Sequence, residues 1–256
     1  MQTKLSVNVN KVATLRNSRG GGVPSVLDAV AVCVELGAPG ITIHPRADAR
    51  HITRADARDI ARALAPLRGR VEYNIEGDPR PDWIELVHEL KPDQATIVPV
   101  LPGEITSQAG WTRDNAIEAL PEVIARFKQD GIRVSLFIDP VLEVVEWAAT
   151  TGADRVELYT EPFARAYERG PAEAQASFDR YAAAAERAKA RGLGVNAGHD
   201  LDLDNLTMFR TLPNLLEVSI GHALISRAVF VGLGRVVREY LDVLAAGGPS
   251  RQEKRA

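Results

Sequence analysis

Cysteine is almost absent from this sequence, which has one, Cys33, among 256 residues. A lone thiol cannot form a disulfide within the chain, and the apolar stretch at residues 30–34 predicts a core residue rather than a nucleophile. Aromatic residues make up 5% of the chain, and the formal net charge is -3. Without a basic excess, nucleic acids and basic membrane-surface binding are disfavoured. The composition therefore indicates small molecules, or further copies of the chain, as partners.

Long hydrophobic runs are also missing. Charged residues or prolines interrupt each apolar run well before the roughly 18 residues that predict a membrane span. Residues 1–8 lack the apolar segment of a signal peptide. These absences predict a cytoplasmic protein. Residues 247–256 are polar and rich in helix breakers, so we expect a flexible tail after a catalytic domain at 1–246.

A join from helix to strand recurs four times along the chain. Gly37, Gly131, Gly152 and Gly192 each end a helix-like run, and a strand-like segment follows within a few residues. Glycine after a helix followed by a buried strand is typical of αβ turns. Eight segments qualify as strands: residues 5–10, 41–44, 71–76, 95–99, 134–139, 156–160, 195–198 and 216–221. Their alternation with helices, at a length near the typical ~250 residues, predicts a single-domain α/β fold, a (β/α)₈ TIM barrel.

The strands alternate in a way that predicts an unusual barrel interior. The third strand places Glu72, Asn74 and Glu76 on one face, and the eighth places Glu217 and Ser219 on one face, each opposite an apolar face. The apolar faces must meet the surrounding helices, which leaves the polar faces inside. We therefore expect a polar cavity where most barrels are filled by Val, Ile and Leu.

Titratable side chains gather at the predicted strand ends, where barrel enzymes keep their catalytic groups. They are His44 and Arg46 after the second strand, Glu72 in the third, Asp139 after the fifth, Glu157 in the sixth, His199 after the seventh and His222 after the eighth. Each taken singly also has a purely structural interpretation. Their convergence on one rim favours an active site. His88 lies in a helical run away from any strand end and is predicted to be a surface residue.

Two stretches are candidate phosphate sites. The first, Arg16 to Gly22, combines arginines with three glycines after the first strand, although it lacks a GxGxxG or Walker spacing and is equally consistent with a solvated basic loop. The second, Gly221 and His222, opens the last helical region after strand eight. Barrels commonly bind phosphate there on backbone amides and a helix N-terminus.

Several segments together resemble the pyridoxine 5′-phosphate synthase family of vitamin B6 biosynthesis. The resemblance lies in residues 7–20, 40–46, 50–52, 134–139, 195–199 and 220–225, together with Glu72. It implies condensation of 3-amino-2-oxopropyl phosphate with 1-deoxy-D-xylulose 5-phosphate, which yields pyridoxine 5′-phosphate, phosphate and water. It implies no metal or other cofactor, and a homo-oligomer, an octamer.

The resemblance also implies roles for particular residues. His44, Glu72 and His199 are expected to transfer protons. Substrate or phosphate is expected to contact Asn8, Arg19, Arg46, His51, Thr106, Gly221 and His222. Thr106 lies on the long segment after strand four, a position suited to a lid.

The sequence departs from the common family pattern at two places. Asn10 and Lys11 stand where many members have Asp and His, and Asp200 follows His199 where glycine is frequent. One hypothesis is that Lys11 and Asp200 form an ion pair over the mouth of the site. Two independent solvated charges are the alternative, because exposed ion pairs contribute only about 0–1 kcal/mol.

Two other functions compete with the synthase. A divalent-metal sugar isomerase or epimerase would use Asp139, Glu157, His199 and Glu217 as an oxygen-rich metal site. A non-catalytic phosphate-binding barrel would need no proton-transfer groups at the rim.

Overall fold

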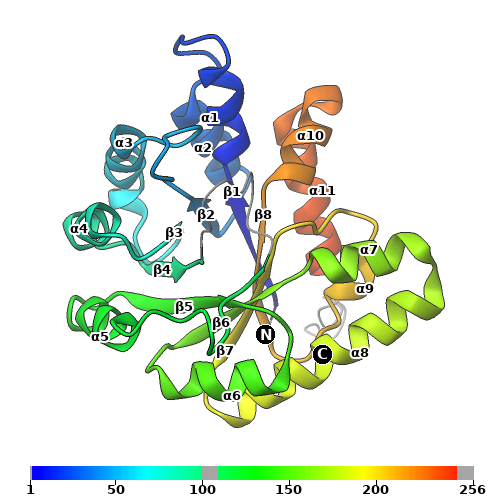
Figure 1. Ribbon diagram of the computed structural model, residues 1–256. Helices are drawn as coiled ribbons and strands as arrows, with labels where there is room; N and C mark the ends of the chain where they lie inside the picture. Colours follow the sequence, from blue (N-terminus) through cyan, green and yellow to red (C-terminus); the bar gives the residue numbers. More distant parts are fainter. Residues whose placement is uncertain (1, 100–108, 247–256) are drawn as a thin grey trace, which may run out of the picture.

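The computed structural model describes residues 2–99 and 109–246, in which eight parallel strands close into one barrel in sequence order (Figure 1). The strands are β1 Lys4–Asn8, β2 Gly40–Ile43, β3 Glu72–Gly77, β4 Gln94–Ile97, β5 Arg133–Ile138, β6 Arg155–Tyr159, β7 Gly194–Gly198 and β8 Leu215–Ile220. Closure occurs where β8 pairs with β1, with Val218 opposite Leu5. The predicted barrel is therefore confirmed, and the predicted strands occur in the predicted order.

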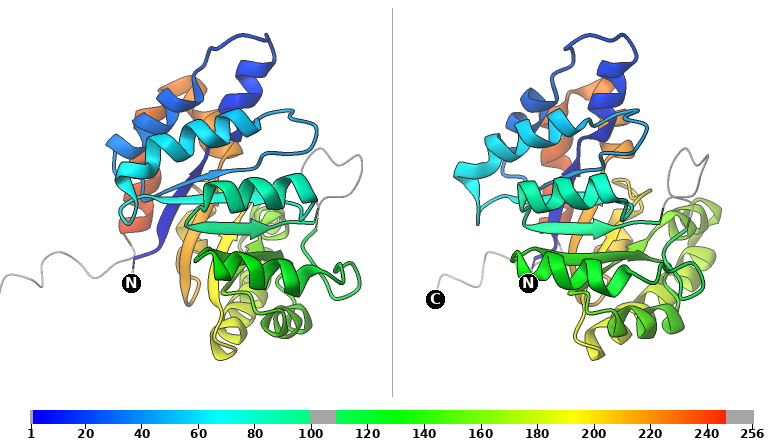
Figure 2. Two further views of the ribbon diagram at one scale, coloured as in Figure 1. Left: turned by 90° about the vertical axis from the view of Figure 1, so that its left-hand side faces the viewer. Right: turned by 60° about the vertical axis from the view of Figure 1, so that its left-hand side comes forward.

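Helices wrap the outside of the barrel (Figure 2). They are α1 Asn10–Asn17, α2 Val26–Glu35, α3 Arg54–Leu64, α4 Pro81–Leu90, α5 Leu120–Gln129, α6 Leu142–Thr150, α7 Glu161–Arg169, α8 Pro171–Ala190, α9 Leu206–Phe209, α10 His222–Val231 and α11 Leu233–Ala245, with a 3₁₀ turn at Ala65–Leu67. None in the described part of the chain is long and apolar enough to cross a membrane. The predicted tail, residues 247–256, lies outside the described residues.

The glycine joins adopt the backbone that the turns require. Gly37, Gly131, Gly152 and Gly192 have φ angles of 90°, 78°, 88° and 80°, which glycine adopts without the steric cost of a Cβ. Each follows a helix and reverses the chain into the next strand. These turns set the alternation of helix and strand that closes the barrel.

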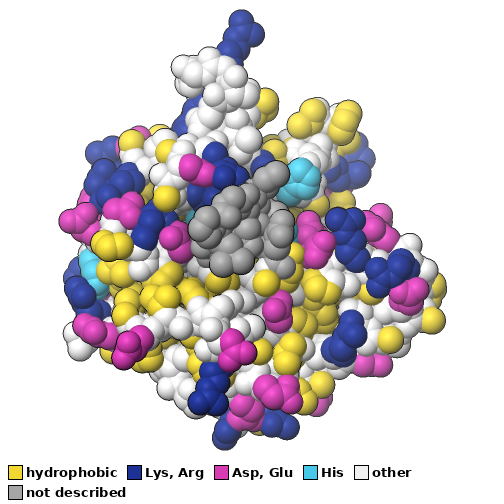
Figure 3. Space-filling view, viewed as in Figure 1, with side chains coloured by type: hydrophobic (Ala, Val, Ile, Leu, Met, Phe, Trp, Pro, Cys, Tyr) yellow, Lys and Arg dark blue, Asp and Glu magenta, His cyan; other side chains and the backbone are white. Residues whose placement is uncertain are grey.

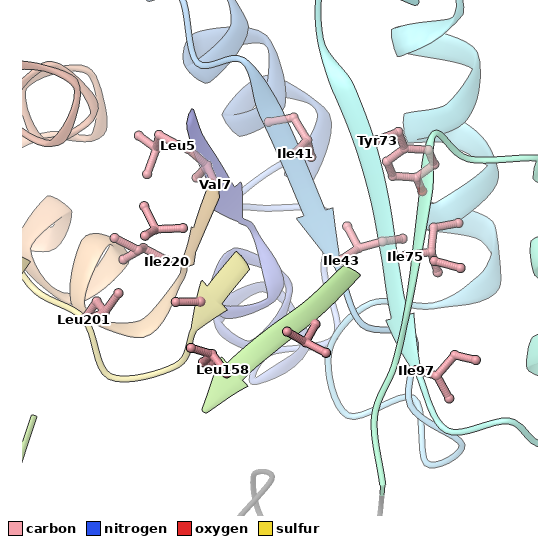
Figure 4. Close-up of a cluster of buried hydrophobic side chains, with 14 of the residues drawn as sticks. Leu5, Val7, Ile41, Ile43, Tyr73, Ile75, Ile97, Leu158, Leu201 and Ile220 are labelled. Carbon is pink, nitrogen blue, oxygen red and sulfur yellow. The ribbon is translucent and has the colours of Figure 1, made fainter. Parts of the chain in front are cut away.

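The apolar core is a layer between the strands and the helices. Leu5, Val7, Ile41, Ile75 and Ile220 are fully buried in it, and they point outward from the strands in the close-up of this layer (Figure 4). Cys33, also fully buried, packs in the same cluster as predicted. The core therefore lies outside the barrel wall and leaves the inside to other side chains.

Polar side chains fill the barrel interior, as the strand alternation predicts. The Ser6 and Thr42 hydroxyls share a hydrogen bond of 2.6 Å, and the Asn74 amide donates to Thr42 at 3.3 Å. Thr96 donates to Asn74 at 3.0 Å and accepts from Gln94 at 3.4 Å. These mutual bonds offset the cost of removing polar groups from water.

Candidate active site

A cavity of about 420 Å³ opens at the carboxyl-terminal ends of the strands. Charged side chains and a histidine lie on this face of the molecule, near α1 and α10 (Figure 3). The lining consists of Asn8, Asn10, Lys11, Thr14, His44, Arg46, Arg50, His51, Glu76, Val98, Phe137, Glu157, His199, Asp200, Ser219, Gly221 and His222. Most of the predicted site residues are therefore brought together.

A buried histidine and a largely buried glutamate, whose side chain is 12% exposed, form the centre of this cavity. His44 follows β2, and its Nδ1 lies 3.9 Å from Oε2 of Glu76 near the end of β3. The amide of Asn8 donates to Oε2 of Glu76, and the hydroxyl of Ser219 donates to Oε1, each at 3.4 Å. Four strands thus hold one acid–base pair, because β1, β2, β3 and β8 are neighbours in the barrel.

The surroundings shift both groups towards their neutral forms. Burial raises the pKa of Glu76 to about 8; the Ser219 hydrogen bond opposes this rise and the charge of Glu217 adds to it. Burial, with the nearby His51 and the positive charge of Arg46, holds the pKa of His44 well below its ordinary value of 6.5. At neutral pH the Glu76 carboxyl is therefore mostly protonated, and the His44 imidazole is a neutral base.

Glu72, expected to be the catalytic carboxylate, does not reach this cavity. It is the first residue of β3 and forms an ion pair with Arg133 of β5. Side chains alternate along a strand, so Glu76 lies on the same face about 13 Å closer to the carboxyl-terminal rim. The placement of the carboxylate at Glu72 was wrong. The sequence carried the signal for Glu76, because barrel active sites lie where strands end.

A second glutamate lies beside the pair. Glu157 of β6 is 3% exposed, and burial together with the charge of Glu76 raises its pKa well above the ordinary value. A Cβ on Gly198 of β7 would collide with Oε1 of Glu157. Glycine at the end of β7 therefore leaves the space that this carboxyl occupies.

Asn10 orients the segment that carries His44. Its Oδ1 accepts from the backbone N–H of His44 at 2.9 Å, and its own N–H donates to Oδ1 of Asn8 at 3.0 Å. The residue that departs from the common family pattern thus links the ends of β1 and β2. Lys11 lines the cavity beside it.

His51 enters the cavity from the loop after β2. Its Nδ1 accepts from the N–H of Ile52 at 2.9 Å, and burial, with the charges of Arg46 and Lys11, lowers its pKa to about 4. Its backbone carbonyl accepts from Asn17 at 2.8 Å. His51 and Arg46 thus lie together in the cavity, as expected, and His51 is neutral at physiological pH.

The first predicted phosphate stretch is built differently from expectation. The stretch does not follow β1 directly, because α1 lies between them. Its first residue, Arg16, lies in the last turn of that helix. Arg16 forms a two-pronged ion pair with Asp56 of α3, at 2.5 and 2.9 Å. Arg19 lies on the exposed turn beyond α1 and is not among the cavity-lining residues. Arg16 and Asn17 therefore hold the His51 loop, a role the sequence did not reveal.

The remaining predicted residues lie at the ends of β7 and β8. Nδ1 of His199 lies 2.6 Å from Oδ2 of Asp200. Gly221 precedes α10, and a Cβ there would come within 3.0 Å of the Asn8 backbone oxygen. His222 is the first residue of α10 and lines the cavity. Thr106 lies outside the described residues.

Two alternatives can be compared with this geometry. The Asp200 carboxylate bonds to His199, and no ion pair with Lys11 is found among the described residues, so that hypothesis was wrong. Of the proposed metal ligands, Glu217 pairs in register with Lys4 at the opposite end of the barrel. Within residues 2–99 and 109–246, no three or more His, Cys, Asp or Glu side chains are arranged to hold a metal.

Outside the cavity, His88 of α4 contacts Asp130 through Nδ1 at 2.6 Å. This part of the surface joins α4 to the end of α5 and does not contribute to the site. His88 lies away from the strand ends, as predicted, but it is half-buried rather than a surface residue, because its ring packs edge-on against Phe127.

The closed barrel, with a buried acid–base pair at its carboxyl-terminal rim, defines a (β/α)₈-barrel enzyme. The sequence also matches a family profile, described as pyridoxal phosphate biosynthesis protein PdxJ, over residues 5–246. The chain belongs to this family, and the resemblance seen in the sequence is confirmed.

Curated relatives agree with the family over nearly their whole length. A pyridoxine 5′-phosphate synthase from Flavobacterium johnsoniae is 54% identical over 243 residues, which are 94% of this chain and 99% of the relative. Another of the same name, from Porphyromonas gingivalis, is 50% identical over 244 residues, 95% of this chain and 99% of the relative.

Solved structures at low identity share the fold. Phosphoribosyl anthranilate isomerase from Thermus thermophilus superposes with a TM-score of 0.58 at 16% identity, covering 95% of this chain and 99% of that one. A structure described as native KDPGal gives a TM-score of 0.60 at 13% identity, covering 96% and 100%. At these identities the likeness concerns the barrel alone.

Proposed function

We propose that this chain is a pyridoxine 5′-phosphate synthase that condenses 3-amino-2-oxopropyl phosphate with 1-deoxy-D-xylulose 5-phosphate, releasing phosphate and water. Relatives of that name cover 94% of the chain at about half identity. The observation in the structure that carries the proposal is the Glu76–His44 pair in a polar cavity. The metal-dependent isomerase is not favoured, because one of its four proposed ligands, Glu217, lies towards the opposite end of the barrel from the other three.

Joining an amine to a ketone, losing water and closing an aromatic ring require repeated proton transfers. Glu76 takes the role first assigned to Glu72, because its pKa of about 8 lies near the operating pH, where a group both gives and accepts protons readily. His44, neutral through burial, accepts protons. His199, on the other side of the cavity, donates them.

The phosphate groups need donors at the rim of the cavity. The first turn of α10, at Gly221 and His222, offers backbone N–H groups and the positive end of a helix dipole. Arg46 and His51 form a second group of donors beside Asn8. We keep Arg19 and Thr106 as proposed contacts from the family resemblance.

The direct test supplies the purified chain with both phosphorylated substrates and measures pyridoxine 5′-phosphate and released phosphate. We expect both products only when both substrates are present, and unchanged turnover after exhaustive chelation, because Glu76, His44 and His199 supply the proton transfers. If a folded chain with an intact active site formed no product, the proposal would be overturned. Loss of turnover on chelation, restored by Mg²⁺ or Mn²⁺, would contradict the metal-free proton transfers proposed here.

The family resemblance further implies a homo-octamer in the cytoplasm, which we retain as a proposal. Val229 and Phe230 of α10 are 69% and 87% exposed. Adjacent large apolar side chains at this exposure are suited to burial against a second copy.

A further inference from the structure

We propose that Asp200 is a positioning residue that holds the imidazole of His199 in one tautomer and one orientation, with Nε2 directed to proton transfer. The inference rests on the proposed function to the extent that His199 exchanges protons with substrate. Many members of the family that this chain resembles have glycine at the position of Asp200. Glycine has no side chain that could hold the imidazole.

The contact has the geometry of a charge-assisted hydrogen bond. Nδ1 of His199 and Oδ2 of Asp200 are 2.6 Å apart, and both residues line the cavity. Burial raises the pKa of Asp200, but the hydrogen bond from His199 and the positive charge of Arg165 outweigh it and bring the pKa below 3.8. The carboxylate is therefore ionised at neutral pH, so the N–H of His199 donates and the carboxylate accepts.

A carboxylate on Nδ1 decides what the other ring nitrogen does. A neutral imidazole carries one proton, and an acceptor at Nδ1 keeps it there, which makes Nε2 the basic nitrogen. When Nε2 gains a proton, the same carboxylate stabilises the imidazolium, which then donates from Nε2. Without Asp200, we expect the ring to revert to the tautomer that histidine favours in water, with the proton on Nε2.

The backbone around the pair is built to hold it. His199 has a φ of 91°, which a residue with a side chain adopts only when its surroundings enforce it. The N–H of Leu201 donates to the His199 carbonyl at 2.6 Å, and the buried Asn205 donates through its amide to the Asp200 carbonyl at 3.1 Å. This turn brings the carboxylate of residue 200 back onto the ring of residue 199.

The ring itself is held from a second side. Tyr159 of β6 packs edge-on against His199, with ring centroids 5.1 Å apart and an interplanar angle of 83°. The Tyr159 hydroxyl donates to Glu161 at 3.2 Å, which limits its own rotation. Tyr159 and Asp200 therefore restrict rotation of the imidazole from two sides.

The tautomer is measured by solid-state ¹⁵N NMR of protein labelled in histidine, a method that does not depend on assembly size. The chain has five histidines, and the signals lost in His199→Gln identify those of His199. At a pH where the ring is neutral, we expect Nδ1 to carry the proton in the parent and Nε2 to carry it in Asp200→Ala. Asp204→Asn, which removes a charge from the same loop at an exposed position, is the control and should leave the spectrum unchanged.

Kinetics separate positioning from substrate binding. For Asp200→Ala we expect kcat to fall about 10- to 100-fold, the range known for loss of the hydrogen-bond partner of a metal-ligating histidine, with KM within about twofold. Asp200→Asn, which keeps an acceptor oxygen without the charge, should fall between the parent and Asp200→Ala. Asp204→Asn should match the parent in both parameters.

The two readouts distinguish the possible failures. An unchanged His199 tautomer in both Asp200 variants overturns the positioning role, and so does a changed tautomer with unaltered kcat. Failure of the proposed function is recognised separately, because the parent would then form no pyridoxine 5′-phosphate while the tautomer shift would still be observed.

Discussion

Glu72 and Glu76 lie on the same face of β3 but have different neighbours. Glu72 pairs with Arg133 at the start of the strand, whereas Glu76 lies among Asn8, His44 and Ser219 in a cavity. The first carboxylate is therefore engaged by an arginine. Burial without a cation leaves the second with a raised pKa, the condition in which a carboxyl exchanges protons near neutral pH.

The first prediction compares these two residues by the same substitution. Glu76→Gln should lower turnover by about 10²- to 10⁴-fold, the range for loss of a general acid–base group, because the amide keeps the size but cannot accept the proton. Glu72→Gln should keep most turnover and lower the melting temperature, since Arg133 loses its charged partner. The measurements are steady-state kinetics and thermal denaturation; the reverse ranking would return the catalytic role to Glu72.

The second prediction concerns stability against pH. Glu76 has a pKa of about 8 in the fold against an ordinary 4.5, so between these values the folded state binds more protons than the unfolded state. Stability conferred by this group is complete below pH 4.5 and is lost as the pH rises through 8, by up to about 1.4 kcal/mol per pH unit. Glu76→Gln should therefore be more stable than the parent at pH 8.5 and equal to it at pH 4.5 in denaturant titrations. Equal stabilities at both pH values would contradict the raised pKa.

At the scale of elements, α1 and α3 fix the loop that carries His51. Arg16 spans from α1 to Asp56 of α3, and Asp56 also completes the capping box of α3 with Thr53. Asn17 holds the His51 carbonyl. The loop between β2 and α3 is thus tied at its far end to the helix after β1.

The third prediction tests this tie with two arginines of α1 and its following turn. Arg16→Ala should destabilise the fold by about 1–3 kcal/mol, as expected for a partly buried charged hydrogen bond, and should raise KM for a phosphorylated substrate by displacing His51. Arg19→Ala, at an exposed position, should leave the melting temperature unchanged. Its KM should rise only for the substrate whose phosphate Arg19 contacts. If Arg16→Ala had the KM and stability of the parent, the loop that carries His51 would not depend on Arg16 for its conformation.

The elements were easier to predict from the sequence than the site. The glycines at 37, 131, 152 and 192 and the alternation of polar and apolar residues are local signals, and each depends on backbone sterics that neighbours do not change. The catalytic carboxylate was assigned to Glu72 instead of Glu76, because the role depends on depth in the barrel, which strand alternation alone does not give. The roles of Asn10, Arg16 and Asp200 depend on partners from other segments or on a turn with positive φ at His199, so sequence spacing could not reveal them.

At the scale of the whole molecule, one helix joins the site to two of the three most exposed large apolar side chains among the described residues. Helix α10 begins at His222, in the cavity, and continues to Val229 and Phe230 at its far end. Helix α10 stands beside α1 on the same side of the molecule (Figure 1). Burial of this end of α10 against a second copy would therefore restrain the helix whose first turn is proposed to hold phosphate.

The last prediction follows from that arrangement. Phe230 is 87% exposed, and an aromatic side chain of this size buries about 150–250 Å² when covered, so Phe230→Glu should place a charge in any contact between copies and lower the assembly mass. Val141→Glu, at a 43% exposed position before α6, is the matched control and should leave the mass unchanged. Analytical ultracentrifugation gives the mass, and kinetics should show a higher KM for phosphorylated substrate in Phe230→Glu alone, because α10 loses its support. An unchanged mass in Phe230→Glu would place any interface between copies elsewhere on the barrel.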